Sequence, residues 1–61
     1  MYSKYAELRD SRGVTDYRVS KETGITKSTF SDWKSGRSAP GPQKLLLLSK
    51  YFDVPIEYFL E

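Results

Sequence analysis

Residues 15–36 read TDYRVSKETGITKSTFSDWKSG, and a short helical pattern lies on either side of Gly24. The first pattern begins at Thr15, whose hydroxyl can cap the free backbone amides at the start of a helix, and it ends before Gly24. The second begins at Thr26 and ends at Gly36, because glycine readily takes the left-handed conformation that follows many helices. We therefore expect two helices joined by a tight turn.

Apolar side chains lie at positions that can fasten these two helices together. They are Val19, Ile25, Phe30 and Trp33. Their spacing suits a buried face on each helix. Trp33 could instead stack on a nucleic-acid base, but its spacing with Phe30 favours the core. The pattern is a helix-turn-helix, in which a glycine permits the sharp turn and the second helix projects as a rigid rod.

The outward side of the second helix is polar and mostly short. Its residues there are Lys27, Ser28, Ser31, Asp32 and Ser35. A rigid helix with this surface can enter the major groove of DNA and present hydrogen-bonding groups to base edges. Lys27 opens this helix, where reach into the groove is greatest, so we expect it to contact a base. A merely solvated lysine is the alternative.

The flanking sequence predicts three further short helices and no strand. The first covers about residues 3–12, with Tyr5 and Leu8 on one face. A later helix opens at Pro42, and a last one starts at Pro55, because proline is tolerated in the first helical turn. Leu45, Leu48 and Phe52 are expected to face inward, and the last helix carries Ile56, Phe59 and Leu60. The expected fold is all-α, a compact five-helix bundle that forms one domain over residues 1–61.

The composition argues against an enzyme. The chain has 61 residues with no histidine and no cysteine, so the usual metal ligands, the thiol nucleophile and the commonest general base are missing. A domain of this size leaves no volume for a deep cleft. We expect no catalytic residue, metal, cofactor or small-molecule ligand. No apolar run approaches the ~20 residues that span a bilayer, which favours a soluble intracellular domain without a membrane partner.

Charge is distributed unevenly along the chain. Ten basic and eight acidic side chains give a net charge of +2. Between Lys4 and Arg37 there are eight basic residues against five acidic ones, whereas two lysines face three acids from Ser38 onward. A mildly basic front fits a polyanion partner, although an ordinary solvated surface would show a similar bias.

Several short motifs follow one another in a fixed order and spacing. They are Leu8-Arg9, Val14-Thr15, Val19-Ser20, Gly24-Ile25-Thr26, Phe30, Trp33, Gly36, Pro40 and the segment LSKYFDV at residues 48–54. In this order they resemble the Cro and C1-repressor-like helix-turn-helix family, also called the XRE family, of phage and bacterial transcription regulators. The resemblance covers nearly the whole chain. It implies a lambda-repressor-like bundle whose third helix reads DNA, usually as a symmetric dimer on a palindromic operator.

The resemblance also implies which positions contact DNA. Base-reading positions fall on Lys27, Ser28 and Asp32, and Ser31 shares their outward face. Lysine can donate to guanine and aspartate can accept from cytosine, so a half-site with a G·C pair is expected. Asp32 could instead act only by excluding wrong sequences. Phosphate-contacting positions fall on Thr15, Asp16, Ser35 and Arg37, and further candidates are Tyr17, Thr26 and Lys34. An ordinary half-exposed tyrosine is the alternative at position 17.

Two departures from the family pattern affect this interface. Asp16 stands where glutamine is common, and an acid near a phosphate is repelled unless its carboxylate caps the helix. Lys34 stands where many members carry a glutamate that pairs with the arginine corresponding to Arg9. Either Arg9 finds another acid, such as Asp10 or Asp32, or Lys34 turns toward phosphate.

A leucine run at residues 45–48 suggests a surface for a second subunit. Consecutive helical residues rotate by about 100°, so Leu46 or Leu47 must point outward. With Tyr51, Tyr58 and Leu60, the outward leucine would form a patch that a second copy covers, giving a homodimer at least on DNA.

The leading functional hypothesis is a sequence-specific regulator of transcription, most simply a repressor, that binds double-stranded DNA. The alternative is a protein-binding domain, as in antitoxins of this fold, that uses its leucine-rich face. The length of the chain suits either a complete small regulator or the DNA-binding part of a longer repressor. We expect it in the cytoplasm of a bacterial or phage-infected cell, associated with the nucleoid.

Overall fold

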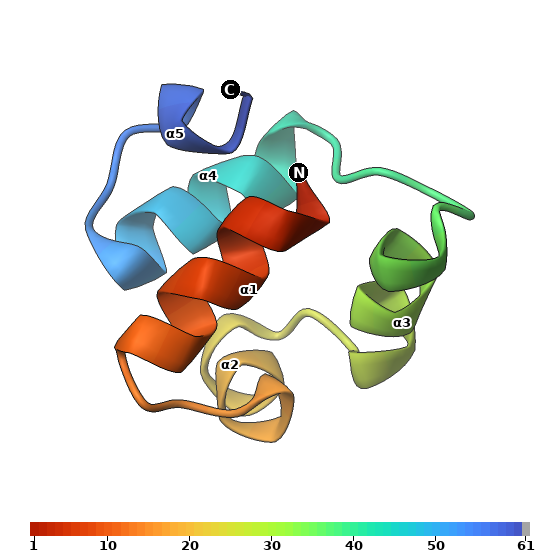
Figure 1. Ribbon diagram of the computed structural model, residues 1–61, viewed down its shortest axis with the longest axis horizontal. Helices are drawn as coiled ribbons and strands as arrows, with labels where there is room; N and C mark the ends of the chain where they lie inside the picture. Colours follow the sequence, from red (N-terminus) through yellow and green to blue (C-terminus); the bar gives the residue numbers. More distant parts are fainter. Residues whose placement is uncertain (61) are drawn as a thin grey trace.

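The computed structural model of the chain describes residues 1–60, and Glu61, the last residue of the expected domain, lies outside the described residues. Within that range the chain forms α1 (Tyr2–Ser11), α2 (Asp16–Thr23), α3 (Lys27–Ser35), α4 (Pro42–Phe52) and α5 (Glu57–Leu60), with no strand. In Figure 1, α1 lies at the centre, with α4 and α5 on one side of it and α2 and α3 on the other. The all-helical fold with five helices is confirmed for residues 1–60.

The predicted ends of α2 and α3 are confirmed in detail. Thr15 and Thr26 each accept a hydrogen bond from the backbone amide three residues later, at 3.2 and 3.3 Å. Gly24 and Gly36 end the two helices with φ angles of 82° and 80°. A residue with a Cβ is disfavoured at such angles, which explains glycine at both positions.

The last helix begins later than the sequence predicted. We expected it to start at Pro55, but α5 begins at Glu57. Two backbone amides in this segment donate to carbonyls three residues earlier, at 3.0 and 2.9 Å. Such bonds are those of a tighter 3₁₀-type turn, which begins at Pro55 and overlaps the single turn of α5. The other boundaries agree with the prediction to within one residue, including the start of α4 at Pro42.

All five helices contribute to one aromatic-rich core in the described part of the chain. Its buried members are Tyr5, Leu8, Val19, Ile25, Phe30, Trp33, Leu45, Leu48, Phe52 and Phe59. Tyr5 stacks on Phe30 with ring centroids 4.9 Å apart, which joins α1 to α3. Trp33 is only 5% exposed, so its predicted core role is confirmed.

The leucine run divides between core and surface as expected for a helix. Leu45 and Leu48 are buried, whereas Leu46 is 43% exposed and Leu47 is 42% exposed. Leu60 of α5 is also exposed, at 68%. These three leucines leave apolar area on the surface of α4 and α5.

Candidate nucleic-acid interface

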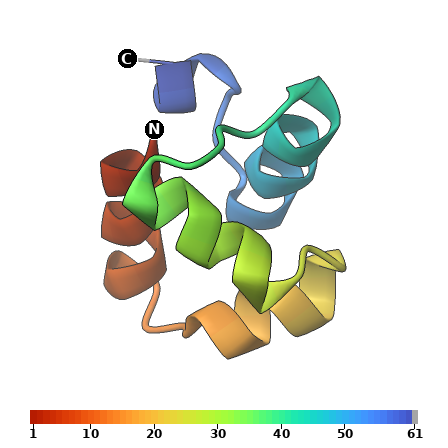
Figure 2. The same cartoon turned by 90° about the vertical axis from the view of Figure 1, so that its right-hand side faces the viewer.

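The outer face of α3 is polar and open. In Figure 2, α3 crosses the front of the molecule, with α2 below it. Phe30 and Trp33 hold its inner side, with ring centroids 5.3 Å apart and nearly perpendicular rings. The remaining surface carries the predicted base-reading positions. Lys27, Ser28 and Ser31 are exposed, and Asp32 is half-buried.

Lys27 is the first residue of α3, and its side chain contacts α2. The Lys27 ammonium lies 5.5 Å from the centre of the Tyr17 ring. Tyr17 itself is 61% exposed. Two residues that the sequence placed separately, one as a base contact and one as a phosphate contact, therefore lie side by side.

The hydroxyl groups near the start of α3 are mutually bonded. Besides capping the helix, the Thr26 hydroxyl lies 2.8 Å from the Thr29 hydroxyl and 3.2 Å from the Ser28 hydroxyl. At the other end of α3, the Ser35 hydroxyl donates to the Asp32 carbonyl at 3.1 Å. All these groups except Asp32 and Thr29 are exposed, so a polar ligand on the surface of α3 can reach them.

Arg37 and Lys34 provide positive charge at the end of α3. The Arg37 guanidinium lies 3.6 Å from the Asp32 carboxylate, and the Arg37 side chain is 78% exposed. Lys34 is exposed as well. Its charge is near enough to Asp16 of α2 to contribute to a lowered pKa of that carboxyl group. Lys34, near the end of α3, therefore lies close to the start of α2.

Arg9 forms the main polar contact between α1 and α2. Its guanidinium bonds to Asp10 and to Asp16 at 3.0 Å each, and it also donates to the Tyr2 hydroxyl at 3.2 Å. The Tyr5 hydroxyl donates to the same Asp16 oxygen at 2.6 Å. Of the two partners named from sequence, Asp10 is confirmed. The suggestion of Asp32 is wrong, because that side chain pairs with Arg37 instead.

Sequence reasoning missed Asp16 as the partner of Arg9. A usable signal was present, because Tyr5 and Arg9 are four residues apart on one face of α1 and Asp16 opens the next helix. Burial opposes ionisation of Asp16, but the bonds from Tyr5 and Arg9 outweigh it and hold its pKa below the ordinary value. Burial of the Tyr5 hydroxyl, together with its bond to Asp16, raises the pKa of Tyr5. The network is therefore ionic at neutral pH, with the carboxylate turned toward α1.

A family model described as helix-turn-helix matches residues 6–59, which include all of α2 and α3. This chain belongs to the Cro/C1-type helix-turn-helix family. The family is one of DNA-binding regulators, and this match supports the expectation that the helix-turn-helix chain is not an enzyme.

Two relatives of this helix-turn-helix chain carry transcription-related names. One is the HTH-type transcriptional activator BcrR of Enterococcus faecalis, 28% identical over 57 residues, which cover 93% of this chain and 28% of the relative. The other is the uncharacterized HTH-type transcriptional regulator YobD of Bacillus subtilis, 28% identical over 54 residues, which cover 88% of this chain and 48% of the relative. The chain thus spans less than half the length of both. No solved structure matches it with comparable significance.

The five residues predicted to form a dimer surface do not share one environment. Leu46, Leu47 and Leu60 are exposed. Tyr51 is half-buried, and its hydroxyl donates to Glu22 of α2. Tyr58 is half-buried against α1, where the Lys4 ammonium lies 5.2 Å from its ring centre. The two tyrosines therefore have partners inside the helix-turn-helix domain, and the three leucines form the open part of the set.

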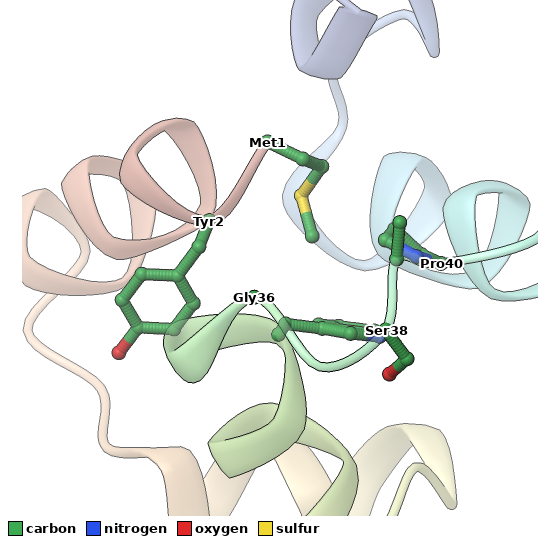
Figure 3. Close-up of a pocket in the computed structure, with 7 residues that line it drawn as sticks. Met1, Tyr2, Gly36, Ser38 and Pro40 are labelled. Atoms are coloured by element: carbon green, nitrogen blue, oxygen red, sulfur yellow. The ribbon is translucent and has the colours of Figure 1, made fainter.

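A hollow of about 340 Å³ lies between the start of α1 and the segment after α3. Figure 3 shows Met1 and Tyr2 on one side of it and Gly36, Ser38 and Pro40 on the other. No acidic or basic side chain lines this hollow. Residues 1–60 of the helix-turn-helix chain also hold no cluster of potential metal ligands, and none of their helices is long and apolar enough to span a membrane.

Proposed function

We propose that this chain is a single DNA-binding domain that recognises a specific double-stranded sequence through α3, within a protein that regulates transcription. The observation that carries the proposal is the combination of two faces on α3. Phe30 and Trp33 fix its inner face to the core, and its outer face presents only polar side chains at the predicted base-reading positions. Membership of the Cro/C1-type family and the names of two relatives support the same function.

Base recognition is assigned to Lys27, Ser28, Ser31 and Asp32. Lys27 donates to guanine O6 or N7, which is the pairing expected for a lysine in the major groove. Asp32 accepts from cytosine or rejects other bases. Its contact with Arg37 is long and exposed, so it is weak and readily exchanged for a contact with DNA. The half-site is expected to contain at least one G·C pair.

Phosphate recognition is assigned to the start of α2 and to both ends of α3. The residues are Thr15, Asp16, Tyr17, Thr26, Lys34, Ser35 and Arg37. Asp16 takes part through its backbone amide at the helix start, because its carboxylate is bonded to Arg9 and Tyr5. Since Arg9 neutralises Asp16, the charge of Lys34 remains available to a phosphate. The same arrangement therefore accounts for both departures from the family pattern, the acid at Asp16 and the lysine at Lys34.

A homodimer on a palindromic operator is the proposed binding state. Leu46, Leu47 and Leu60 supply exposed apolar area that a second copy would cover. Tyr51 and Tyr58 would border that area. Two-fold symmetry would place the half-sites roughly 34 Å apart, one turn of DNA. The protein would act in the cytoplasm of a bacterial or phage-infected cell, where it would be associated with the nucleoid.

Repression is the proposed outcome, because a protein that occupies an operator excludes other proteins from it. The relative from Enterococcus faecalis is named an activator, so the direction of regulation needs its own assay. A reporter gene placed behind the operator would lose expression when the protein is produced. Increased expression would assign activation instead.

Selection from a randomised duplex pool tests the proposed function. The untagged chain is used at low and at near-physiological salt. Enrichment of a palindrome supports specific binding by a dimer, and enrichment of a single half-site supports specific binding by a monomer. No enrichment at either salt would contradict the proposal. It would favour the alternative of an antitoxin-like, protein-binding domain, for which the three exposed leucines are the candidate surface.

A further inference from the structure

Tyr17 differs from the other four tyrosines in its surroundings. Tyr5 is fully buried, and Tyr2, Tyr51 and Tyr58 are half-buried and packed against the core. Tyr17 is 61% exposed and lies outside the core cluster. Tyr17 lines a surface hollow of about 580 Å³ together with other residues of α2. Burial therefore does not account for an aromatic residue at this position.

Lys27 occupies a position that helix electrostatics disfavours. The start of a helix carries partial positive charge, so acidic side chains are stabilising there and basic ones are not. The first turn of α3 contains no acid, and its first residue is this lysine. A residue that breaks a local rule needs another explanation, either a compensating contact or a function.

The Tyr17 ring offers the Lys27 ammonium a favourable partner. The negative face of an aromatic ring attracts a cation within about 6 Å of its centre, and the observed separation is 5.5 Å. A free lysine samples many rotamers and loses that freedom when it binds. A ring held on the neighbouring helix restricts those rotamers before DNA arrives, which lowers the entropic cost of binding.

We propose that Tyr17 is a specificity-determining residue whose ring, projecting from α2, orients Lys27 of α3 toward the base pair that Lys27 reads. The aliphatic stem of Lys27 stays on the ring while its ammonium donates to the base. This inference rests on the proposed function. A bond from the Tyr17 hydroxyl to a phosphate would strengthen binding to all sequences alike, whereas the ring acts on discrimination between bases.

A double-mutant cycle tests the proposal, with discrimination as the readout. Selection with the Lys27→Met variant first identifies the base pair that Lys27 reads. Affinity is then measured for the enriched duplex and for a second duplex in which only that base pair is changed. Tyr17→Leu is expected to lower the ratio of the two affinities by about two- to five-fold, because Lys27 then loses its rotamer freedom only when it binds the preferred base pair. Tyr17→Phe keeps the ring and is expected to keep the ratio. In the Lys27→Met background, Tyr17→Leu should change the ratio no further.

Controls separate this role from a general effect on charge or folding. Lys50→Met removes an exposed lysine from the last turn of α4 and is expected to leave the ratio unchanged. Circular dichroism checks that each variant is folded. In the free protein, the methylene protons of Lys27 should show an upfield ring-current shift that Tyr17→Phe keeps and Tyr17→Leu removes.

The outcomes also separate this inference from the proposed function. A Tyr17→Phe variant that loses discrimination as Tyr17→Leu does would overturn the role of the ring. If Tyr17→Leu lowered the affinity ratio equally in the wild-type and Lys27→Met backgrounds, the coupling between Tyr17 and Lys27 would be overturned. An enriched sequence with no base pair that depends on Lys27 would overturn the inference and leave specific DNA binding standing. No enriched sequence at all would overturn both.

Discussion

The network of Arg9, Tyr5 and Asp16 should contribute measurably to stability, and the part of that contribution that depends on the charge of Asp16 should disappear in acid. Asp16→Ala removes an ion pair at 3.0 Å and the acceptor of a fully buried tyrosine hydroxyl. A buried donor left without a partner costs about 1–3 kcal/mol. The Asp16 side chain is 37% exposed, so the ion pair adds only about 0.5–1 kcal/mol. We expect Asp16→Ala to lower the free energy of unfolding by about 1.5–4 kcal/mol.

Asp16→Asn isolates the charge, because asparagine can still accept the Tyr5 hydrogen bond. It should cost about 0.5–1.5 kcal/mol, which includes the loss of an acid from the first turn of α2. The folded-state pKa of Asp16 lies below its ordinary value of 3.8, so the charge stabilises the fold above pH 3.8. That stabilisation is lost as the pH falls through the lower folded-state pKa. The difference between wild type and Asp16→Asn should therefore close in acid.

Urea unfolding followed by tryptophan fluorescence, at neutral pH and at several acidic values, measures these differences. Asp10→Asn is the matched control, because Asp10 also contacts Arg9 at 3.0 Å but is 71% exposed. Its effect should stay within about 0.5 kcal/mol. An Asp16→Asn variant as stable as wild type at neutral pH, or a difference that persists in acid, would refute the reasoning.

Four further variants test the interface, the turn and the dimer. Lys27→Ala should weaken binding and relax preference at one or two base pairs, whereas Arg37→Ala should weaken all sequences alike and reduce the salt slope by about one unit; identical behaviour in a competition assay would contradict this division. Gly24→Ala should cost about 1 kcal/mol in urea unfolding, because a Cβ there meets no atom within 4 Å but is strained at a φ of 82°. An unchanged urea midpoint would show that the turn adjusts to accept alanine without strain. Replacing Leu46 and Leu47 together by serine should leave unfolding within about 1 kcal/mol but reduce affinity for a palindrome and not for a half-site. Equal affinity losses on both duplexes would place the dimer contact elsewhere.

Features set by neighbouring residues could be predicted from the sequence. The caps at Thr15 and Thr26 and the left-handed glycines at positions 24 and 36 depend only on the backbone of one turn, and all four were predicted. The helical period likewise predicted that Trp33 faces the core. The base and phosphate contacts stay predictions.

Features set by packing between helices could not be predicted in the same way. The spacing of Tyr5 and Arg9 marks one polar face of α1, but which residue of α2 meets that face depends on how the two helices cross, so the pairing of Arg9 with Asp16 was missed. The predicted start of α5 was wrong because Pro55 opens a tighter turn that runs into the helix. The contact between Tyr17 and Lys27 joins two helices and depends on the angle between them.

The central claim is that the surface formed by α3 and the start of α2 binds DNA. An NMR titration of the labelled chain with the enriched duplex tests it most directly. We predict the largest amide shifts at residues 15–17 and 26–37, with side-chain shifts at Lys27. Shifts confined to residues 42–60, on α4 and α5, would contradict the account.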